Sequence, residues 1–368
     1  MRLSRHMSVA LLAAMATALA AQAGSSAAVG PTVATSCSAV EGAGKERFPA
    51  YLEDSFAQLK DEVPKLHGLR FEASAVTDAG DGVLGQTGEA IAVMMPRVPN
   101  LLANEDLSQV TVPMPFTVDE LRTASSGAGA VPNGGRGNRG APPPSVDPRK
   151  LEGKELEQAI HDMLMLHAQH VNFGYRIEPK PDAKLGTVLD ESRTNVRGEA
   201  IQVDPTNPNN PHAAGFGNAW LMFVPANQRE SRFRYLGRQK MDGHETVVVA
   251  FAQVPEKVGL PGRIVVGGND CRFYSQGVAW IDAAAAQIVR LQTDLLTPVP
   301  AVGMKRLRSE IDFNTVNIAR ANLTLWMPKS VEVSWESTDQ AGAELHKYSK
   351  YRLFRATSRV VMPDEAKP

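Results

Sequence analysis

The chain has 368 residues, of which 43% are hydrophobic and 21% are charged, and its formal net charge at pH 7 is −1. This composition is typical of a globular protein that buries one large core or two modest ones, and it excludes a chain that is disordered throughout. The near-zero charge argues against a nucleic-acid partner, because binding to phosphates requires an excess of Lys and Arg.

The first 23 residues have the three parts of a secretory signal: a basic start at residues 2–6, an apolar run over 9–21 and a small-x-small cleavage site at 21–23. The apolar run has about 13 residues, mostly Ala, whereas a membrane span takes roughly 20 strongly apolar ones. We therefore predict cleavage after Ala23 and a periplasmic or secreted protein that contacts membranes only peripherally, if at all. Cleavage removes two positive charges and no negative one, which leaves a net charge of about −3.

The chain holds two cysteines, Cys37 and Cys271. In an oxidising compartment such a pair persists as a disulfide, which would tie the start of the mature chain to its late part. Two unrelated thiols are the alternative, because the sequence does not show whether the two residues are close. Export also argues against a reduced, nucleophilic Cys271.

Helices are predicted in the N-terminal part of the mature chain, which follows a small, polar and flexible leader over residues 24–45. Apolar residues at spacings of three and four predict an amphipathic helix within 46–66, and a second helix is predicted over 82–95, where Pro96 ends it. Residues 107–116 then have the pattern of a strand. Together these elements make up an N-terminal segment of residues 46–123.

Residues 124–149 are predicted to be a disordered insertion. Gly, Pro, Ser and Asn dominate the first part of it, and such a composition buries too little apolar surface to order itself. Residues 135–140 match the G-x-G-x-x-G pattern of dinucleotide-binding proteins, but they lack the preceding strand and the following helix that hold a pyrophosphate. The match is therefore attributed to chance, and no cofactor is predicted.

Residues 150–358 have the alternating pattern of β-strands after a short polar helix over 153–166. The predicted strands span residues 171–177, 186–193, 220–224, 233–236, 246–253, 277–282, 287–295, 310–318, 322–327, 331–337 and 346–356. Short strands joined by polar turns, with helices gathered at one end of the chain, predict an α+β fold in which helices cover one face of an antiparallel sheet. Residues 359–368 form a tail.

No catalytic or metal-binding motif is found in the chain. His161, His167 and His170 are close in sequence, but they have neither an HExxH nor a His-x-His spacing, so no metal ligands are assigned. The Gly-x-Ser-x-Gly motif of many serine hydrolases is absent. Catalysis is therefore unsupported by any set of residues that can be named.

The densest basic run lies within residues 229–240. Along a strand, Arg232 and Arg234 share one face while Phe233 and Tyr235 share the other, which predicts a solvated face over a core face. Contact of the arginines with anionic head groups is the alternative.

Three hairpin and strand segments carry a resemblance to a known family. They are residues 235–251, residues 278–291 and residues 325–333, the last with a Trp-x-Pro strand start. The sequence resembles the LolA-like (lipoprotein-carrier) half-barrel superfamily, and it is similar to uncharacterised secreted bacterial proteins that share these segments and a closing His-x-Tyr-Ser-x-Tyr-Arg-Leu-Phe at 346–354.

The resemblance implies an incomplete, half β-barrel whose concave apolar face is closed by the N-terminal helices and can hold an acyl chain. Carrier members have no catalytic motif, so none is transferred. Large apolar residues on the predicted strands are candidates for the cavity lining, although each could instead be plain core. The candidates are Trp220, Phe223, Phe251, Trp280, Leu291, Phe313, Leu325 and Trp335.

The leading functional hypothesis is an exported, non-enzymatic protein that binds a lipid, a lipid-modified protein or another apolar ligand in a half-barrel cavity. An envelope module that binds another protein for a structural or sensory purpose is the alternative. An exported hydrolase is a third, weaker alternative, because no nucleophile with a base and an orienting group can be named.

Overall fold

The structure is a computed structural model of the chain. It describes residues 9–10, 50–53, 59–61, 63–66, 69–71, 76–114, 160–162, 165, 168–183, 186–195, 198–201, 215–259, 261–266 and 269–354. The predicted leader, the insertion over 124–149 and the tail over 359–368 lie outside the described residues. So does almost all of the predicted signal segment.

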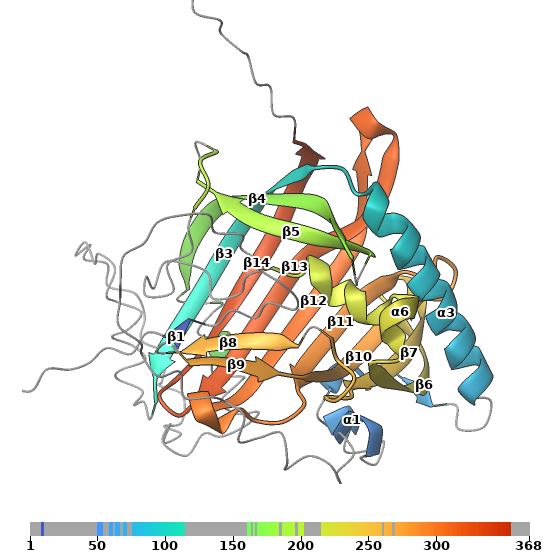
Figure 1. Ribbon diagram of the computed structural model, residues 1–368, viewed down its shortest axis with the longest axis horizontal. Helices are drawn as coiled ribbons and strands as arrows, with labels where there is room; N and C mark the ends of the chain where they lie inside the picture. The colour runs from blue at the N-terminus through green and yellow to red at the C-terminus, as the bar shows by residue number, and fades with distance from the viewer. Residues whose placement is uncertain are drawn as a thin grey trace, which may run out of the picture.

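One antiparallel sheet of eleven strands dominates the fold (Figure 1). In spatial order the strands are β2 (Arg70–Phe71), β6 (Ser231–Met241), β7 (His244–Gln253), β10 (Ser275–Asp282), β11 (Ile288–Leu295), β12 (Met304–Ile318), β13 (Leu323–Ser337), β14 (Gln340–Leu353), β3 (Leu101–Pro113), β4 (Gln169–Asp182) and β5 (Gly186–Thr194). The first and last strands do not pair with each other, so the sheet stays open. The predicted α+β half-barrel is confirmed.

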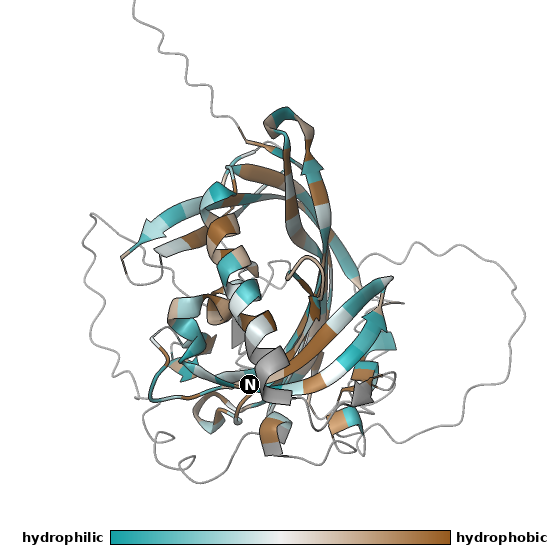
Figure 2. Ribbon diagram, turned by 90° about the vertical axis from the view of Figure 1, so that its right-hand side faces the viewer, coloured by the Kyte–Doolittle hydropathy of each residue, from teal (hydrophilic) through white to brown (hydrophobic). Residues whose placement is uncertain are grey.

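The sheet curves, and its last two strands bend back across its front (Figures 1 and 2). On that concave side β5 contacts the 3-10 helix η5 (Gly217–Phe223), which is followed by the short helix α6 (Pro225–Gln228). The long helix α3 (Val76–Met94) and the 3-10 turn η3 (Met95–Arg97) also pack there, through Leu84, Ile91 and Met95. Together these elements cover the concave face.

The first predicted helix lies on the opposite face of the sheet. It is helical at α1 (Ala50–Glu53) and at residues 59–61, and it ends in the 3-10 turn η2 (Pro64–Leu66). Leu59, Val63 and Leu66 are almost completely buried against β7 and β10. The N-terminal helices therefore divide between the two faces instead of all covering the concave one.

The period-2 alternation of the strands sends neighbouring side chains into different cores. In β10, Ala279 and Ile281 belong to the large core of the concave face, whereas Val278 and Trp280 belong to a smaller core on the other face. All eight residues of β10 are buried. Both faces of the middle strands are thus removed from water.

Three predicted strands differ from the structure. Residues 220–224 were predicted as a strand but lie in η5 and the residue after it, because a short run that is apolar at every position does not distinguish a strand from a buried helix. The predicted strands 322–327 and 331–337 form the single strand β13, with a register shift near Pro328 that keeps both halves paired with β12.

A second, three-stranded sheet was not predicted. It consists of the hairpin β8 (Gly262–Val266) and β9 (Asn269–Phe273), with β1 (Val9–Ala10) beside β8. Three 3-10 turns, η2, η6 (Pro300–Val302) and η7 (Ala319–Ala321), join other elements. The hairpin lies in front of the large sheet in Figure 1.

Cys271 lies in β9, is fully buried and is disulfide-bonded. The chain has one other cysteine, Cys37, which lies outside the described residues.

We predict that Cys37 is the partner of Cys271 and that reduction lowers the free energy of unfolding by about 3–5 kcal/mol, because the bridge closes a long loop in the unfolded chain. Peptide mapping without reductant and urea unfolding with and without reductant test this. Two titratable thiols in the native, unreduced protein would contradict it.

Candidate functional site

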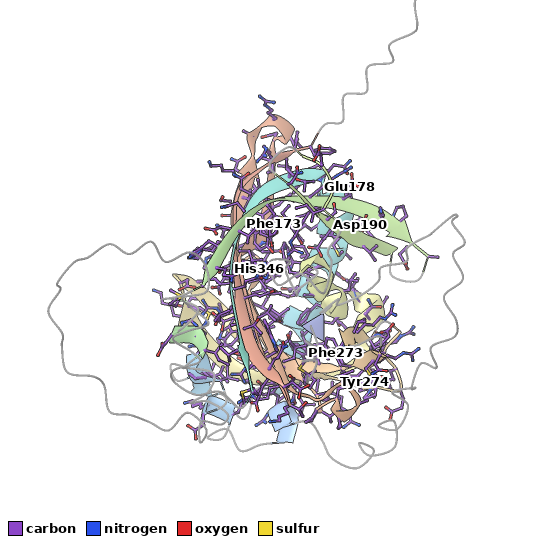
Figure 3. All side chains as sticks on the ribbon, turned by 90° about the vertical axis from the view of Figure 1, so that its left-hand side faces the viewer. Phe173, Glu178, Asp190, Phe273, Tyr274 and His346 are labelled. Atoms are coloured by element: carbon purple, nitrogen blue, oxygen red, sulfur yellow. The ribbon has the colours of Figure 1, made fainter. Side chains whose placement is uncertain are left out.

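A cavity lies between the middle of the large sheet and the elements in front of it. It measures about 40 Å³, enough for a few water molecules, since one needs about 10–15 Å³. Its floor comes from β10 to β14 and its cover from Gly215, Phe216, Ala219 and Phe273. Figure 3 shows His346 midway along the sheet and Phe273 on the hairpin side. The lining comprises Arg193, Gly215, Phe216, Ala219, Phe273, Ser275, Thr293, Asp294, Leu307, Ser309, Ile311, Val331, Val333, His346 and Tyr348.

The sheet register explains why the floor residues meet. Thr293 pairs with Ser309, which pairs with Val333, and Val331 lies between Ile311 and His346. Cross-strand partners point to the same face, so two lateral rows of side chains converge on the cavity. The row of Thr293, Ser309 and Val333 continues to Glu344, and the row of Ile311 and Val331 continues to His346. The Thr293 and Ser309 hydroxyls are 2.6 Å apart.

A buried ion pair forms the polar end of this site. Arg193 of β5 donates from Nε and Nη2 to the two carboxylate oxygens of Glu105 in β3, over 2.7 and 2.8 Å. Both side chains are almost completely buried. A bidentate pair of this kind satisfies the donors and acceptors that burial would otherwise leave unpaired.

His346 connects this pair to a second carboxylate. Its Nδ1 lies 2.7 Å from Glu105 Oε1 and its Nε2 lies 3.2 Å from Glu344 Oε2. The Tyr348 hydroxyl also donates to Glu105 Oε1, over 3.1 Å. When both carboxylates are ionised, the imidazole must donate from both nitrogens, which only the protonated ring does. We call Glu105, Arg193, Glu344 and His346 the ionic cluster.

The pKa values of the cluster follow from these contacts. Burial alone would raise the pKa of Glu105, but the charge of Arg193 and the hydrogen bonds from His346 and Arg193 lower it to about 2. Burial alone would lower the pKa of His346, but its two carboxylate partners raise it. Glu105 is therefore ionised near neutral pH, and the two carboxylates favour the protonated form of His346.

Glu191, two residues before Arg193 on β5, holds the cover in place. Its carboxylate accepts hydrogen bonds from the backbone N–H of Phe216 at 3.2 Å and of Gly217 at 3.0 Å, and from the Tyr175 hydroxyl. A Cβ at Gly215 would come within 2.3 Å of this carboxylate, so a side chain there would displace it. Burial raises the pKa of Glu191 to about 7, although its hydrogen bonds act in the opposite direction.

Three aromatic rings pack between the ionic cluster and the cover. Tyr175 and Phe216 have ring centroids 5.4 Å apart, and each lies 4.9 Å from the ring of Tyr348. Burial raises the pKa of both tyrosines well above the ordinary value, so they remain neutral hydrogen-bond donors. Their packing fixes the start of η5 over the cavity.

The eight apolar residues predicted from the sequence are all buried, but none of them is part of the cavity lining. Seven belong to the large core of the concave face, and Trp280 belongs to the core on the other face, where its indole N–H donates to Gln239 over 3.0 Å. Trp280 therefore does not share a face with the other seven. The group consists of Trp220, Phe223, Phe251, Leu291, Phe313, Leu325 and Trp335, in addition to Trp280.

The ionic cluster was not predicted. Glu105, Arg193 and His346 come from three distant parts of the sequence and form no motif. The sequence does hold one indication of it. In the alternation of β3, Glu105 occupies a position on the buried face, between Ala103 and Leu107. A charged residue at such a position requires a buried partner, but the sequence does not identify which one.

The histidines considered as metal ligands do not come together in the described part of the chain. His161 contacts Glu332 at 2.9 Å and His170 contacts Ser108 at 3.0 Å, while His167 lies outside the described residues. Among the described residues, no group of His, Cys, Asp and Glu has an arrangement that could hold a metal ion.

The basic run on β6 has the predicted division of faces. Phe233 and Tyr235 pack in the large core, whereas Arg234 donates to the backbone carbonyl of Leu52 over 3.2 Å on the other side. Arg232 is exposed.

No protein-family model and no curated protein matches the chain. Two solved structures are similar in outline, each at 10% identity over 74% of this chain and 95% of the other. One is a DUF1329 family protein from Desulfovibrio piger, with a TM-score of 0.32. The other is a domain from Vibrio parahaemolyticus described as an outer membrane lipoprotein-sorting protein, with a TM-score of 0.31. Scores this low transfer no function to this chain.

The pKa of Glu191 predicts a specific pH dependence. Because the folded state holds this proton up to about pH 7 and the unfolded state only to about 4.5, stability decreases as the pH rises between these values, by roughly 2–3 kcal/mol. In Glu191→Gln the contribution of Glu191 should disappear, which leaves only the smaller decrease above about pH 6.5 that the raised pKa of His346 gives both proteins. Urea unfolding at about pH 5 and about pH 7.5 measures it.

The neighbouring exposed carboxylate provides the control, because Asp190→Asn on the other face of β5 should keep the wild-type pH dependence. Glu105 does not affect the comparison of the two pH values. Its lowered pKa stabilises the folded state above about pH 4.5, and this stabilisation is lost only as the pH falls from about 4.5 through about 2. A wild-type protein whose stability is the same at both pH values would contradict the prediction.

Proposed function

We propose that the protein is an exported, non-enzymatic binding protein that takes an amphipathic ligand into the cavity of its concave face. The observation that carries this proposal is the mixed composition of the cavity lining. The lining contains the apolar residues Ile311, Val331 and Val333 and the polar residues Arg193 and His346. A ligand with an apolar chain and a polar end would match both kinds of residue.

The cavity at about 40 Å³ is too small for an acyl chain, so binding requires the cover to move. The cover suits such a motion, because neither η5 nor the hairpin β8–β9 is paired with a strand of the eleven-stranded sheet, and the start of η5 is held to β5 by the Glu191 carboxylate. Phe216, Ala219 and Phe273 contribute its side chains to the cavity. Displacement of these residues would open the floor without breaking a strand pair of the large sheet.

Export supports a role in the cell envelope. The predicted signal places the mature chain in an oxidising compartment, and the disulfide at Cys271 agrees with that setting. No helix among the described residues is long and apolar enough to cross a membrane. We propose that the ligand is a lipid or a lipid-modified protein of the envelope.

A cavity-filling substitution tests the proposal. Val333→Phe places a ring in the cavity and should weaken binding of a fluorescent acyl probe at least about ten-fold, at a cost in stability of about 1–3 kcal/mol. Probe titration measures the affinity, and native mass spectrometry of protein purified from its own envelope identifies bound lipid.

Ser334→Phe is the matched control, since the neighbouring position on β13 is only partly buried and faces away from the cavity. It should bind the probe as the wild type does. Absence of probe binding to the wild type, together with no co-purified lipid, would exclude the proposed function.

A further inference from the structure

The 3-10 helix η5, which is part of the cover of the cavity, is held by different groups at its two ends. At its end, the side chain of Gln228 in α6 donates to the backbone carbonyl of Phe223 over 2.8 Å and to that of Leu84 in α3 over 2.9 Å. The side chain of Asn227 donates to the carbonyl of Leu221 over 2.9 Å. Because α6 packs against α3 (Figure 1), this end of η5 is joined to the long helix.

The start of η5 is held to the sheet by one side chain, that of Glu191 in the edge strand β5. Its carboxyl group accepts hydrogen bonds from the backbone N–H groups of Phe216, at 3.2 Å, and of Gly217, at 3.0 Å. In the described part of the chain, no other side chain forms a hydrogen bond with residues 215–217. We call this contact the latch, because its loss would free the start of η5 while α6 and α3 still hold its end.

The latch places a partly buried carboxyl group among neutral partners. Its third donor is the Tyr175 hydroxyl. Arg193 lies two residues further along on the same face of β5, but it forms its bidentate pair with Glu105, and none of the described residues forms an ion pair with Glu191. A carboxylate that loses water without gaining a counter-ion is disfavoured, so the closed cover favours the protonated carboxyl group. In agreement, burial raises the pKa of Glu191 to about 7.

The charges around the latch stay constant while Glu191 titrates. The neighbouring tyrosines are neutral, because burial raises their pKa values well above the ordinary value, and the pKa of Glu105 is about 2. The helix η5 has no titratable residue, and the cation of η3, Arg97, is exposed. The titratable neighbours are Tyr175 of β4, Tyr348 and Tyr351 of β14, Glu105 of β3 and Arg193 of β5.

Opening of the latch changes the affinity of Glu191 for its proton. In the open state water replaces the backbone donors, and the pKa of the carboxyl group falls towards the ordinary value of 4.5. Between about pH 4.5 and about pH 7 the closed state therefore holds a proton that the open state releases. The state with fewer bound protons gains as the pH rises, so a higher pH favours opening.

Building on the proposed function, we infer that Glu191 is a proton-linked latch: the ligand enters when this side chain releases Phe216 and Gly217, and the carboxyl group loses its proton to water in the same step. The closed cavity of about 40 Å³ is too small for an acyl chain, so a bound ligand keeps the cover open. Ligand uptake is therefore favoured as the pH rises through this range, and ligand release is favoured as it falls.

Calorimetry with a neutral ligand measures this proton. A fatty acid methyl ester, which does not itself titrate, is bound in buffers of different ionisation enthalpy, and the dependence of the heat on the buffer gives the number of protons released. The wild type should release close to one proton per bound ester at about pH 6 and almost none at about pH 8.5. Its affinity for the ester should increase at least about ten-fold between about pH 5 and about pH 7.5.

Glu191→Gln separates the latch from His346, which lines the cavity and has a raised pKa of its own. At about pH 6 this variant should release about one proton fewer than the wild type. Asp190→Asn removes the exposed neighbouring acid, which pairs with Lys180, and should behave as the wild type does.

Tyr175→Phe serves if Glu191→Gln does not fold, because it keeps the ring that packs on Phe216. The hydroxyl group that it removes lowers the pKa of Glu191 through its hydrogen bond. The pH at which proton release falls to one half should therefore rise, and an unchanged value would contradict the inference.

Hydrogen exchange tests the latch without a ligand. Protection of the backbone amides of residues 216–223, corrected for intrinsic exchange rates, should fall at least about five-fold between about pH 5.5 and about pH 7.5 in the wild type and stay constant in Glu191→Gln. Ester binding without proton release at about pH 6, or protection that does not depend on pH, would overturn the inference and leave the proposed function intact. If protection changed as expected but the ester bound at no pH, the proposed function would be wrong and the latch would stand.

Discussion

The bidentate pair between Arg193 and Glu105 determines how the open sheet is covered. The two residues belong to strands that are separated by β4, a distance of about 9.5 Å in a flat sheet, and their side chains meet on the concave side. The pair therefore holds the last strand over the sheet. That strand carries Glu191, which in turn fixes the start of η5. Loss of either partner would leave a buried charge, at a cost of about 3–5 kcal/mol.

Segments with a regular apolar period gave the most reliable predictions. The strand over 171–177 and the helix over 82–95 were confirmed because one face of each is buried and periodicity reports that directly. The run at 220–224 is apolar at every position, so its period held no information. Alternation along β10 also shows that the side chains of Trp280 and Ala279 point to opposite faces of the sheet. It does not show which of the two faces is concave. That choice depends on contacts between distant segments.

The large apolar side chains that were predicted to line a cavity form the core instead. Trp220, Phe251 and Trp335 fill space, and a close-packed interior leaves little room beside them. The cavity lies where the chain has small residues, among them Gly215, Ala219 and Ser309. A sequence shows such residues everywhere, and only the tertiary structure shows which of them face one another. The same holds for the ionic cluster, whose members lie far apart in sequence.

The double burial of β7 and β10 separates the molecule into parts of different rigidity. Their backbone amides are shielded on one side by η5 and α3 and on the other by the segment around Leu59 and Leu66. Amide hydrogen exchange in these strands then requires opening on a large scale, whereas the edge strand β5 and the hairpin β8–β9 have fewer neighbours to lose. The centre of the sheet acts as a fixed frame, and the elements on its concave side can rearrange against it without loosening the fold.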